Sequence, residues 1–352
     1  MSPAPATLLT IAERVEARLT AILDGEVARW AEVDGDLRAP LLAVRSLVSS
    51  GGKRLRPAFC YWGFVGAGGD PGDSRPVDAG AAFELLHAFA LFHDDVMDGS
   101  TTRRGLRTTH LSFADEHDSS GWAGEPRRFG EGVAILVGDL AHVYADVLLR
   151  DAPGAALDVW NELRIELNLG QYLDIRGTAK GERRRHVAER IARYKSGKYT
   201  VERPLHLGAL LAAPERAGEL LAPLSAYGLP LGDAFQMRDD VLGAFGDEHL
   251  TGKPVGDDLR EGKPTPLMAI ATERANDAQR VVLQLVGRAD LDDAEVAAIQ
   301  EVLVETGALS ELEAQIDRLA TEALAALDAL PLNDDAIKGL DELARYVAWR
   351  EA

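Results

Sequence analysis

The sequence predicts an all-α protein. Apolar residues recur every three or four positions through most of the chain, which is the spacing of amphipathic helices. The first stretch with this spacing contains Leu8, Ile11, Val15, Leu19 and Ile22. Alanine and leucine, both good helix formers, are abundant, whereas alternating patterns bounded by hairpin turns are not found in the sequence.

The same spacing predicts the remaining helices in order. They fill roughly 76–98, 130–150, 155–177, 184–200, 216–245, 264–290 and 295–348. Stretches rich in glycine, proline and polar residues predict loops at 66–76, 119–132 and 246–264. The last is too long for a simple connector, which indicates a functional or mobile segment. We expect residues 1–352 to form a single domain with a motif-bearing core at about 40–275, and the sequence does not support a split near 275.

Composition narrows the function. The chain has 352 residues, 46% of them hydrophobic, which is enough to bury a large core. A formal net charge of −19 argues against non-specific binding to nucleic acid or anionic lipid, while a local cationic cleft would still accept a small anion. Cys60 is the only cysteine, lies in an apolar run and fits a reducing cytoplasm. We expect neither a signal peptide nor a membrane span.

Three carboxylates end the predicted helix 76–98, in the segment FHDDVMDGSTTRRG. Asp94 and Asp98 are four residues apart and therefore share a face, about 6 Å apart along the axis, with His87 on roughly the same face. Such a pair favours a cation, and Mg²⁺ suits oxygen ligands that leave room for water and phosphate. An ordinary solvated helix end is the alternative, although it opposes the helix dipole.

Two arginines follow these carboxylates. The guanidinium groups of Arg103 and Arg104 match phosphate oxygens, so the segment combines ligands for a metal with ligands for a diphosphate. Salt bridges from the arginines to the same carboxylates are the alternative.

A second acidic cluster lies in GDAFQMRDDVLGAFGD. Asp239 and Asp240 end an apolar helix, with Gln236 one turn before them. The position four after Asp239 is Gly243, and the next acid in register is Asp247. This cluster is therefore thinner, and Gly243 marks where the helix is expected to begin to end. Two such helix ends pointing at one cavity would hold several Mg²⁺ ions around one diphosphate.

Basic residues supply further candidate anion ligands. The stretch SSGGKRLRPAFC places Lys53, Arg54 and Arg56 between two glycines and a proline suited to a first helical turn, with a basic surface turn as the alternative. The other candidates lie later in the chain: Lys195, Ser196, Lys253 and Lys263. Gln171 and Asp174 lie three apart on an inward helix face, where they need polar partners, either a ligand or each other.

Four motifs together resemble the trans-type isoprenyl diphosphate synthases of the polyprenyl synthetase family. They are GGKRLRP, HDDVMD with RRG after it, YKS, and QMRDDVLGAFGD with GKPVGDDLREGK, from about 51 to 263. The resemblance implies an isoprenoid synthase fold, a bundle of antiparallel helices around a deep cavity, usually as a homodimer. It also implies Mg²⁺-dependent, head-to-tail condensation of an allylic diphosphate with isopentenyl diphosphate.

The resemblance further implies roles for single residues. Three Mg²⁺ ions are expected, with Asp94, Asp98 and Asp239 as direct ligands supported by Asp95 and Asp240. The allylic diphosphate would be held by Arg103, Lys195, Gln236, Lys253 and Lys263, with Ser196 and Gln171 nearby. The isopentenyl diphosphate would be held by Lys53, Arg56, His87 and Arg104. The expected catalytic set is Asp94, Asp95, Asp98, Asp239, Asp240 and Lys195. The family often has a third aspartate where this chain has Gly243, so the part played by Asp247 stays open.

Product length is expected to depend on the turn before Asp94. Phe89 and Ala90 lie there and would form the floor that stops chain growth, although Phe89 is also compatible with an ordinary core position. One aromatic residue, one small residue and no insertion in DDVMD resemble geranylgeranyl diphosphate synthases. Farnesyl or longer products are the alternative. A class I terpene cyclase and a non-catalytic regulatory subunit are less consistent with the second aspartate pair and the retained basic motifs.

Overall fold

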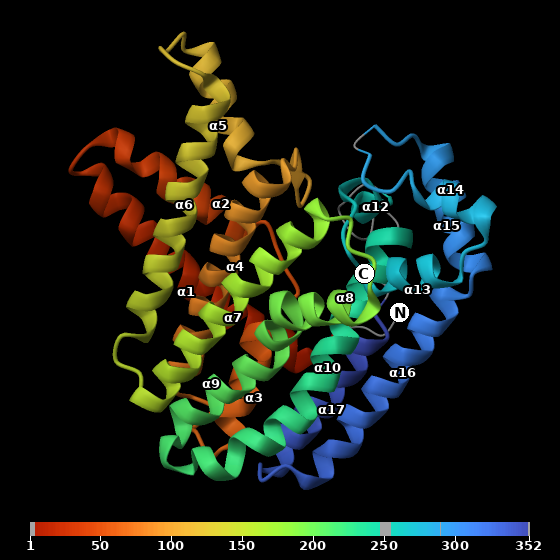
Figure 1. The fold of residues 1–352 in the computed structure, drawn as a ribbon. Coiled ribbons are helices and arrows are strands. Elements are labelled where there is room, and N and C mark those ends of the chain that lie inside the picture. The colour runs from red at the N-terminus through yellow and green to blue at the C-terminus, as the bar shows by residue number, and fades with distance from the viewer. Residues whose placement is uncertain (1–3, 247–254, 289, 351–352) are drawn as a thin grey trace. The chain divides into compact units, whose positions relative to one another are not determined.

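The structure, a computed structural model, describes residues 4–246, 255–288 and 290–350 (Figure 1). Regular structure in these residues is almost entirely helical, which confirms the predicted all-α class. The chain divides into two compact units. The N-terminal unit contains Ala6–Tyr61 and Asp70–Pro153, and the C-terminal unit contains Met1–Pro5, Trp62–Gly69 and Gly154–Ala352. The single domain expected from the sequence stays a prediction.

The N-terminal unit consists of long helices and one small hairpin. Its elements are α1 (Ala6–Ala31), η1 (Gly35–Leu37), α2 (Arg38–Ser49), the first part of α3 (Leu55–Gly66), α4 (Arg75–Asp98), β1 (Thr102–Arg103), β2 (Leu106–Arg107), α5 (Thr109–Ser119) and α6 (Pro126–Leu149). Helix α6 packs against both α4 and α5, and α1 packs against α2 and α4. The end of α4 is therefore supported by neighbours from both earlier and later in the chain.

The apolar stripe predicted in α1 is buried. Leu8, Ile11, Val15 and Leu19 are all buried, and Leu23 completes the stripe in place of Ile22, which is partly exposed. Leu23 lies four residues after Leu19, so the helical repeat explains this correction. The stripe packs closely on α4, because a β-carbon at position 80, occupied by glycine, would lie 2.8 Å from Cγ2 of Val15.

The hairpin after α4 was not predicted. Thr102 pairs with Arg107 and Arg103 pairs with Leu106, which leaves Arg104 and Gly105 as a two-residue turn. Both turn residues have positive φ, 52° and 73°, as a type I′ turn requires. Strands of two residues are too short to give an alternating pattern, so the sequence carried no periodic signal for them.

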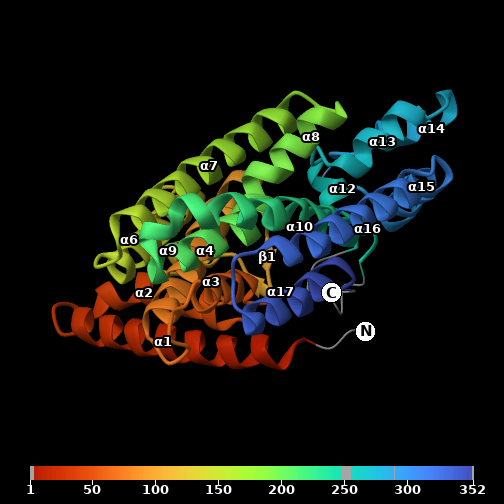
Figure 2. The ribbon, with the colours of Figure 1, turned by 90° about the horizontal axis from the view of Figure 1, so that it is seen from below.

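The C-terminal unit contains the longest helix, α10, together with the helices that follow it. Its elements are the second part of α3, α7 (Gly154–Ala179), α8 (Arg185–Ala192), η2 (Arg193–Glu202), α9 (Arg203–Ala212), η3 (Pro214–Arg216), α10 (Ala217–Phe245), α12 (Asp257–Glu261), α13 (Pro266–Arg274), α14 (Asp277–Leu283), α15 (Asp293–Glu305), α16 (Ala308–Ala326), η4 (Leu327–Ala329) and α17 (Asp334–Ala348). Helix α16 packs along α10, with α17 beside both (Figure 2).

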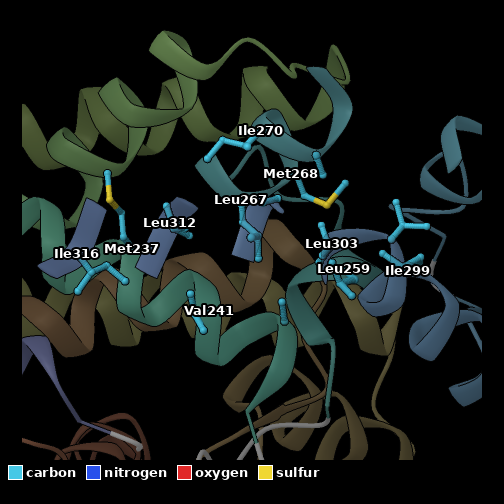
Figure 3. Packing of buried hydrophobic residues seen from close by; sticks show 14 of the residues in the cluster. Met237, Val241, Leu259, Leu267, Met268, Ile270, Ile299, Leu303, Leu312 and Ile316 are labelled. Atoms are coloured by element: carbon cyan, nitrogen blue, oxygen red, sulfur yellow. The ribbon is translucent and has the colours of Figure 1, made fainter. Parts of the chain in front are cut away.

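A hydrophobic cluster holds the second half of this unit together. Met237 and Val241 from α10 belong to it with Leu267, Ile299 and Leu312 from three later helices (Figure 3). Burying a large aliphatic side chain contributes about 1.5–3 kcal/mol, so this cluster fixes the last turns of α10 firmly.

Three predicted helices are divided in the structure. The stretch 184–200 is α8 followed by η2, a π-helix that extends to Glu202. The stretch 264–290 contains the two short helices α13 and α14, and 295–348 contains α15, α16 and α17. Gly307 separates α15 from α16. Its φ of 71° lies in the left-handed region, which glycine adopts at little cost. Apolar spacing alone did not reveal these breaks.

Glycines allow α7, η2 and α10 to approach closely. A β-carbon at position 170 on α7 would lie 2.5 Å from the backbone nitrogen of Lys195 on η2. Gly197 on η2 and Gly232 on α10 meet in the same way, backbone against backbone. The widened turn of η2 is thereby held between two helices, and π-helical turns are frequent at functional sites.

Cys60 is completely buried in α3, as expected for a core residue. Burial raises the pKa of its thiol far above the ordinary value, so the thiolate form is suppressed.

Candidate active site

The first acidic cluster occupies the last two turns of α4. Asp95 is buried, Asp94 is partly exposed and Asp98 is exposed. Gly99 caps the helix in the left-handed region with φ 65°, and its N–H donates to the carbonyl oxygen of Asp95. The helix thus ends within one residue of Asp98, and Asp94 and Asp98 lie one turn apart at its open end, as predicted.

Arg103 holds the buried carboxylate of this cluster. Its Nε donates to Oδ1 of Asp95 at 2.8 Å and its Nη2 donates to the same atom at 2.5 Å, while Oδ2 of Asp94 lies 4.0 Å from Nη2. Burial raises the pKa of Asp95, and the Arg103 charge acts against that rise. Salt bridging, the alternative weighed from sequence, is therefore present for Arg103 in this structure.

Arg104, the next residue, has different partners. Its Nη1 donates to the carbonyl oxygens of Leu47 (3.2 Å) and Gly51 and lies 3.5 Å from Oγ of Ser50. Burial lowers the pKa of this guanidinium. Arg103 lies in strand β1, whereas Arg104 lies in the type I′ turn that follows it. The two consecutive side chains therefore reach different partners.

The glycine-rich turn before α3 is stabilised by Arg54, in the left-handed region with φ 50°. Its buried side chain donates to the carboxylate of Glu84 on α4 and to the carbonyl oxygen of Val48. Sequence analysis singled out Arg54 as a basic residue but missed Glu84. Lys53 is exposed and Arg56 partly exposed on the same turn.

His87 lies among these arginines. Burial, followed by the charges of Arg56 and Arg104, holds the pKa of His87 well below its ordinary range. His87 and Arg104 also line one crevice together with Leu47, Val48, Arg54, Glu84, Ala88 and Leu91. The structure therefore brings His87 and Arg104, two of the four residues expected to hold isopentenyl diphosphate, into one crevice, and the charge of Arg56 also acts on the imidazole.

Phe89 packs between two histidines in the N-terminal unit. Its ring stacks on His142 of α6 at 4.7 Å and lies tilted against His93 at 4.6 Å between ring centroids. Phe89 is buried, and Ala90 is partly exposed. These contacts fix the Phe89 ring, while its role as a floor for the product stays a prediction.

The second acidic cluster lies at the end of α10. Nε2 of Gln236 donates to Oδ1 of Asp240 at 2.9 Å, and Oδ2 of Asp240 is buried with no hydrogen-bond partner. Burial raises the pKa of Asp240 well above its ordinary value, and the carboxylates of Asp258 and Asp239 act in the same direction.

Arg350 pairs with Asp239. Its guanidinium donates to Oδ1 of Asp239 and, at 3.3 Å, to the carbonyl oxygen of Phe235, and it lies 4.4 Å from the centre of the Phe235 ring. Arg350 is 4% exposed, although it lies near the end of the sequence. It belongs to no motif that was recognised, so only the three-dimensional structure reveals it.

The lysines of this unit also meet carboxylates. Nζ of Lys195 on η2 donates to Oδ2 of Asp174 on α7 at 2.5 Å, so the predicted inward position of Asp174 has a partner. Lys263 donates to Oδ1 of Asp258 at 3.0 Å and forms an ion pair with Glu261. Ser196 and Gln171 are partly exposed on η2 and α7. Lys253 and Asp247 lie outside the described residues.

The donor set fits Mg²⁺ with an incomplete protein shell. Within the described ranges, no three histidine, cysteine, aspartate or glutamate side chains are close enough to enclose one ion. Mg²⁺ commonly takes one or two carboxylates and completes its octahedron with water and substrate phosphate, so the pair Asp94 and Asp98 suits it. The orphaned Oδ2 of Asp240 likewise indicates a place for a cation or its bound water.

An all-α fold in which α4 and α10 each carry an aspartate pair near the C-terminal end, each pair with basic side chains in its own unit, is typical of enzymes that handle isoprenoid diphosphates. Residues 41–303 match the family described as Polyprenyl synthetase, and the chain belongs to this family of prenyltransferases. The resemblance inferred from the motifs is thereby confirmed.

Similar proteins carry related names. The chain is 32% identical to geranylfarnesyl diphosphate synthase from Aeropyrum pernix, over 86% of this chain and 92% of that one. It is 34% identical to geranylgeranyl diphosphate synthase from Mycobacterium tuberculosis, over 84% and 78% of the two chains. A crystal structure of geranylgeranyl pyrophosphate synthase from Corynebacterium glutamicum, complexed with isoprenyl diphosphate and magnesium, has a TM-score of 0.90 and 37% identity, and covers 97% of this chain and 98% of that one.

Proposed function

We propose that this protein condenses an allylic diphosphate (dimethylallyl, geranyl or farnesyl) with isopentenyl diphosphate in the cytoplasm, and that its main product is geranylgeranyl diphosphate. The observation that carries the proposal is the end of α4, where Asp94 and Asp98 lie one turn apart beside the Arg103–Asp95 pair. Family membership and the names of the relatives support the same chemistry.

Asp94, Asp98 and Asp239 are the proposed ligands of Mg²⁺, three ions in all. Bound there, the ions would neutralise the diphosphate while the allylic C–O bond breaks. Arg103 would give up part of its hydrogen bonding to Asp95 and bind phosphate oxygens instead. The allylic diphosphate would also be bound by Lys195, Gln236, Lys253 and Lys263. Asp95 and Asp240 would orient the ligands beside them.

Isopentenyl diphosphate would be bound by Lys53, Arg56, His87 and Arg104. Because the low pKa keeps His87 neutral, His87 would contribute a hydrogen bond while the cationic side chains contribute charge. The apolar helix walls would exclude water, which otherwise captures the allylic cation. The isopentenyl double bond then attacks C1 of that cation, and the proton lost from C2 of the isopentenyl unit would pass to the released diphosphate.

The expected product length rests on Phe89 and Ala90. The ring of Phe89, fixed by His142 and His93, would block a chain longer than geranylgeranyl, while Ala90 would leave room beside it. Relatives named for geranylgeranyl products support this length, whereas those named for farnesyl and geranylfarnesyl products mark the nearest alternatives.

Labelled isopentenyl diphosphate provides the test. Purified protein is incubated with it and each allylic primer in turn, with Mg²⁺ or with chelator, and the products are separated by chromatography. We expect geranylgeranyl diphosphate with Mg²⁺ and none with chelator. Condensation that continues after complete metal removal would contradict the proposal. Conversion of geranylgeranyl diphosphate to a hydrocarbon without isopentenyl diphosphate would identify a terpene cyclase.

We also propose a homodimer formed through α6. Pro126–Leu149 is the one helix of the described residues with the length and apolarity of a membrane span, and 39% of its most apolar window is buried. Leu136 and Val143 are 62% and 57% exposed, with Ile135 and Val147 also exposed. A second copy would cover this apolar face symmetrically. Light scattering tests the proposed homodimer by measuring the molar mass of wild type and of Leu136→Glu/Val143→Glu. A monomeric wild type would contradict the proposal.

A further inference from the structure

Four charged side chains form a buried cluster beside η2, and none of them takes part in the chemistry proposed above. Glu166 on α7 accepts hydrogen bonds from Nζ of Lys198 and from Nε (2.8 Å) and Nη2 (2.7 Å) of Arg203. Oε2 of Glu202 lies 3.8 Å from Nζ of Lys198 and 3.9 Å from Nε of Arg203. Two carboxylates therefore balance two cations, and none of the four side chains is more than 15% exposed.

Glu166 links this cluster to α7. Lys198 and Glu202 belong to η2 and Arg203 begins α9, so the other three members lie on one continuous stretch of chain. Burial by itself would raise the pKa of Glu166, but hydrogen bonds from Arg203 and Lys198 lower it below its ordinary value, and the carboxylate is ionised. Removal of this charge would leave two buried cations with one carboxylate, a costly arrangement that weakens the attachment of η2 to α7.

One face of α7 contacts η2 at three points around Lys195. Glu166, Gly170 and Asp174 are spaced four residues apart and therefore share that face. Oδ2 of Asp174 accepts from Nζ of Lys195 at 2.5 Å, and a β-carbon at position 170 would lie 2.5 Å from the backbone nitrogen of Lys195. Glu166 holds the next turn of η2 through Lys198. The position of Lys195 is thus tied to the position of its whole turn against α7.

The opposite side of η2 lies against α10. A β-carbon at position 232 on α10 would lie 2.5 Å from the carbonyl oxygen of Gly197, and Oγ of Ser225 on α10 donates to Oε1 of Glu202 at 2.6 Å. π-Helical turns are rare, so packing from both sides is what retains this one. On the side of α7, the charged cluster supplies that support.

We infer that Glu166 is a positioning residue, which through Lys198 and Arg203 sets the place of η2 and so presents the ammonium group of Lys195 to the allylic diphosphate. The inference rests on the proposed function for the ligand of Lys195. Displacement of a binding group by about 1 Å can lower an enzyme's rate about 100-fold, even when the substituted residue is far from the reacting atoms. A cluster that only stabilised the fold would affect both substrates alike, whereas Glu166 should affect the allylic diphosphate alone.

Binding of inorganic diphosphate in the presence of Mg²⁺, measured by calorimetry, tests the inference without any condensation. The four proteins are wild type, Glu166→Gln, Lys195→Ala and the double variant. Glu166→Gln should weaken binding about 10-fold, as expected for members of one ion-pair network. In the Lys195→Ala background the same substitution should change the affinity less than about two-fold, because the group through which Glu166 acts is absent. Equal losses in the two backgrounds would overturn the inference.

Steady-state kinetics provide a second readout, which a loss of stability alone would not change. Glu166→Gln should raise KM for the allylic diphosphate about 10-fold and leave KM for isopentenyl diphosphate within about two-fold of wild type. A parallel rise of both KM values would identify a purely structural role and refute the positioning role.

Glu162→Gln, which removes an exposed carboxylate one turn earlier on α7, is the matched control and should behave as wild type does. Lys198→Met leaves the Arg203–Glu166 pair in place and should weaken diphosphate binding about three-fold. Circular dichroism and urea midpoints establish folding, and Lys198→Met decides the question if Glu166→Gln is unfolded. Wild-type affinity in whichever folded variant decides would contradict the inference.

The outcome for wild type separates this inference from the proposed function. Wild type that binds diphosphate but condenses no substrate would overturn the proposed function and leave the binding result for Glu166 standing. Wild type that binds no diphosphate would overturn both.

Discussion

The acidic ends of α4 and α10 contain the same kind of residue but are built differently. At α4, Asp95 is held by Arg103, eight residues later, through a tight hairpin. At α10, Asp239 is held by Arg350, 111 residues later, and Gly243 is covered by Asp258 from another helix. One cluster is assembled almost within a single stretch of chain and the other from three separate stretches. The aspartates of both clusters are visible in the sequence, but the partners of the second cluster, Arg350 and Asp258, are revealed only by the structure.

The largest expected effect comes from removing a direct metal ligand at α4. Asp94→Ala should lower kcat about 1000-fold, because electrostatic stabilisation of the leaving diphosphate is lost, while the fold is retained. Steady-state assays and circular dichroism measure both. Asp115→Ala, which removes an exposed carboxylate of α5, is the matched control. Parent-level turnover by purified Asp94→Ala would refute the metal assignment.

The next comparison removes one arginine from each cluster. Arg103→Ala leaves Asp95 buried without its partner and should lower the free energy of unfolding by about 3 kcal/mol. Arg350→Ala should cost less, about 2 kcal/mol, because the side chain of Asp239 is 39% exposed and water replaces part of the lost interaction.

Urea unfolding measures these two costs. Arg345→Ala, which breaks an exposed pair with Asp341, should give no measurable change. A larger loss for Arg350→Ala than for Arg103→Ala would reverse the ranking of the two clusters.

Phe89→Ala is expected to change the product more than the rate. Without the ring that stacks on His142, the floor opens and chains longer than geranylgeranyl should accumulate. The fold should lose about 3–5 kcal/mol from the cavity left behind, so the assay is run at low temperature. Phe92→Leu, a conservative change at a neighbouring buried position of α4, controls for general loosening. Unchanged chain length in Phe89→Ala would show that Phe89 is an ordinary core residue.

The smallest expected effect is a pH response that belongs to the α4 region. The folded-state pKa of His87 is depressed below 6.5, so the native protein resists a proton that the unfolded chain accepts. The stability from His87 is thus present above about pH 6.5 and is lost as pH falls toward the folded pKa, with a slope of up to about 1.4 kcal/mol per pH unit.

Urea midpoints of wild type and His87→Gln between pH 8 and pH 5 measure this response. The difference in urea midpoint between wild type and His87→Gln should become smaller as pH falls, because only wild type loses the contribution of His87. His206, whose pKa burial lowers to about 3, is present in both proteins and cancels. Parallel curves would contradict the assignment.

Much of the fold was predictable because it follows local rules. The helices predicted at 76–98, 155–177 and 216–245 correspond to α4, α7 and α10 within two residues at each end. The type I′ hairpin was missed because two-residue strands carry no periodicity. The break at Gly307 was missed because apolar spacing continues on both sides of it.

The candidate site divides in the same way. Asp94, Asp98, Asp239 and Asp240 were recognisable as carboxylates at helix ends, since the chain itself positions them. Glu84 and Arg350 were missed because their partners are distant in sequence. Asp258 lies in the motif GKPVGDDLREGK but was not singled out, because its approach to Gly243 is seen only in the structure. An ion pair between Arg350, two residues after the end of α17, and Asp239 on α10 leaves no pattern that spacing or composition would reveal.

The complete burial of Cys60 makes the chain convenient for chemical labelling. Its suppressed thiolate and zero exposure leave the folded native protein inert toward maleimides. A second cysteine placed at an exposed position such as Met97, next to the α4 cluster, would then be the sole reactive thiol. A fluorophore there would report substrate binding in real time without any need to remove the native cysteine.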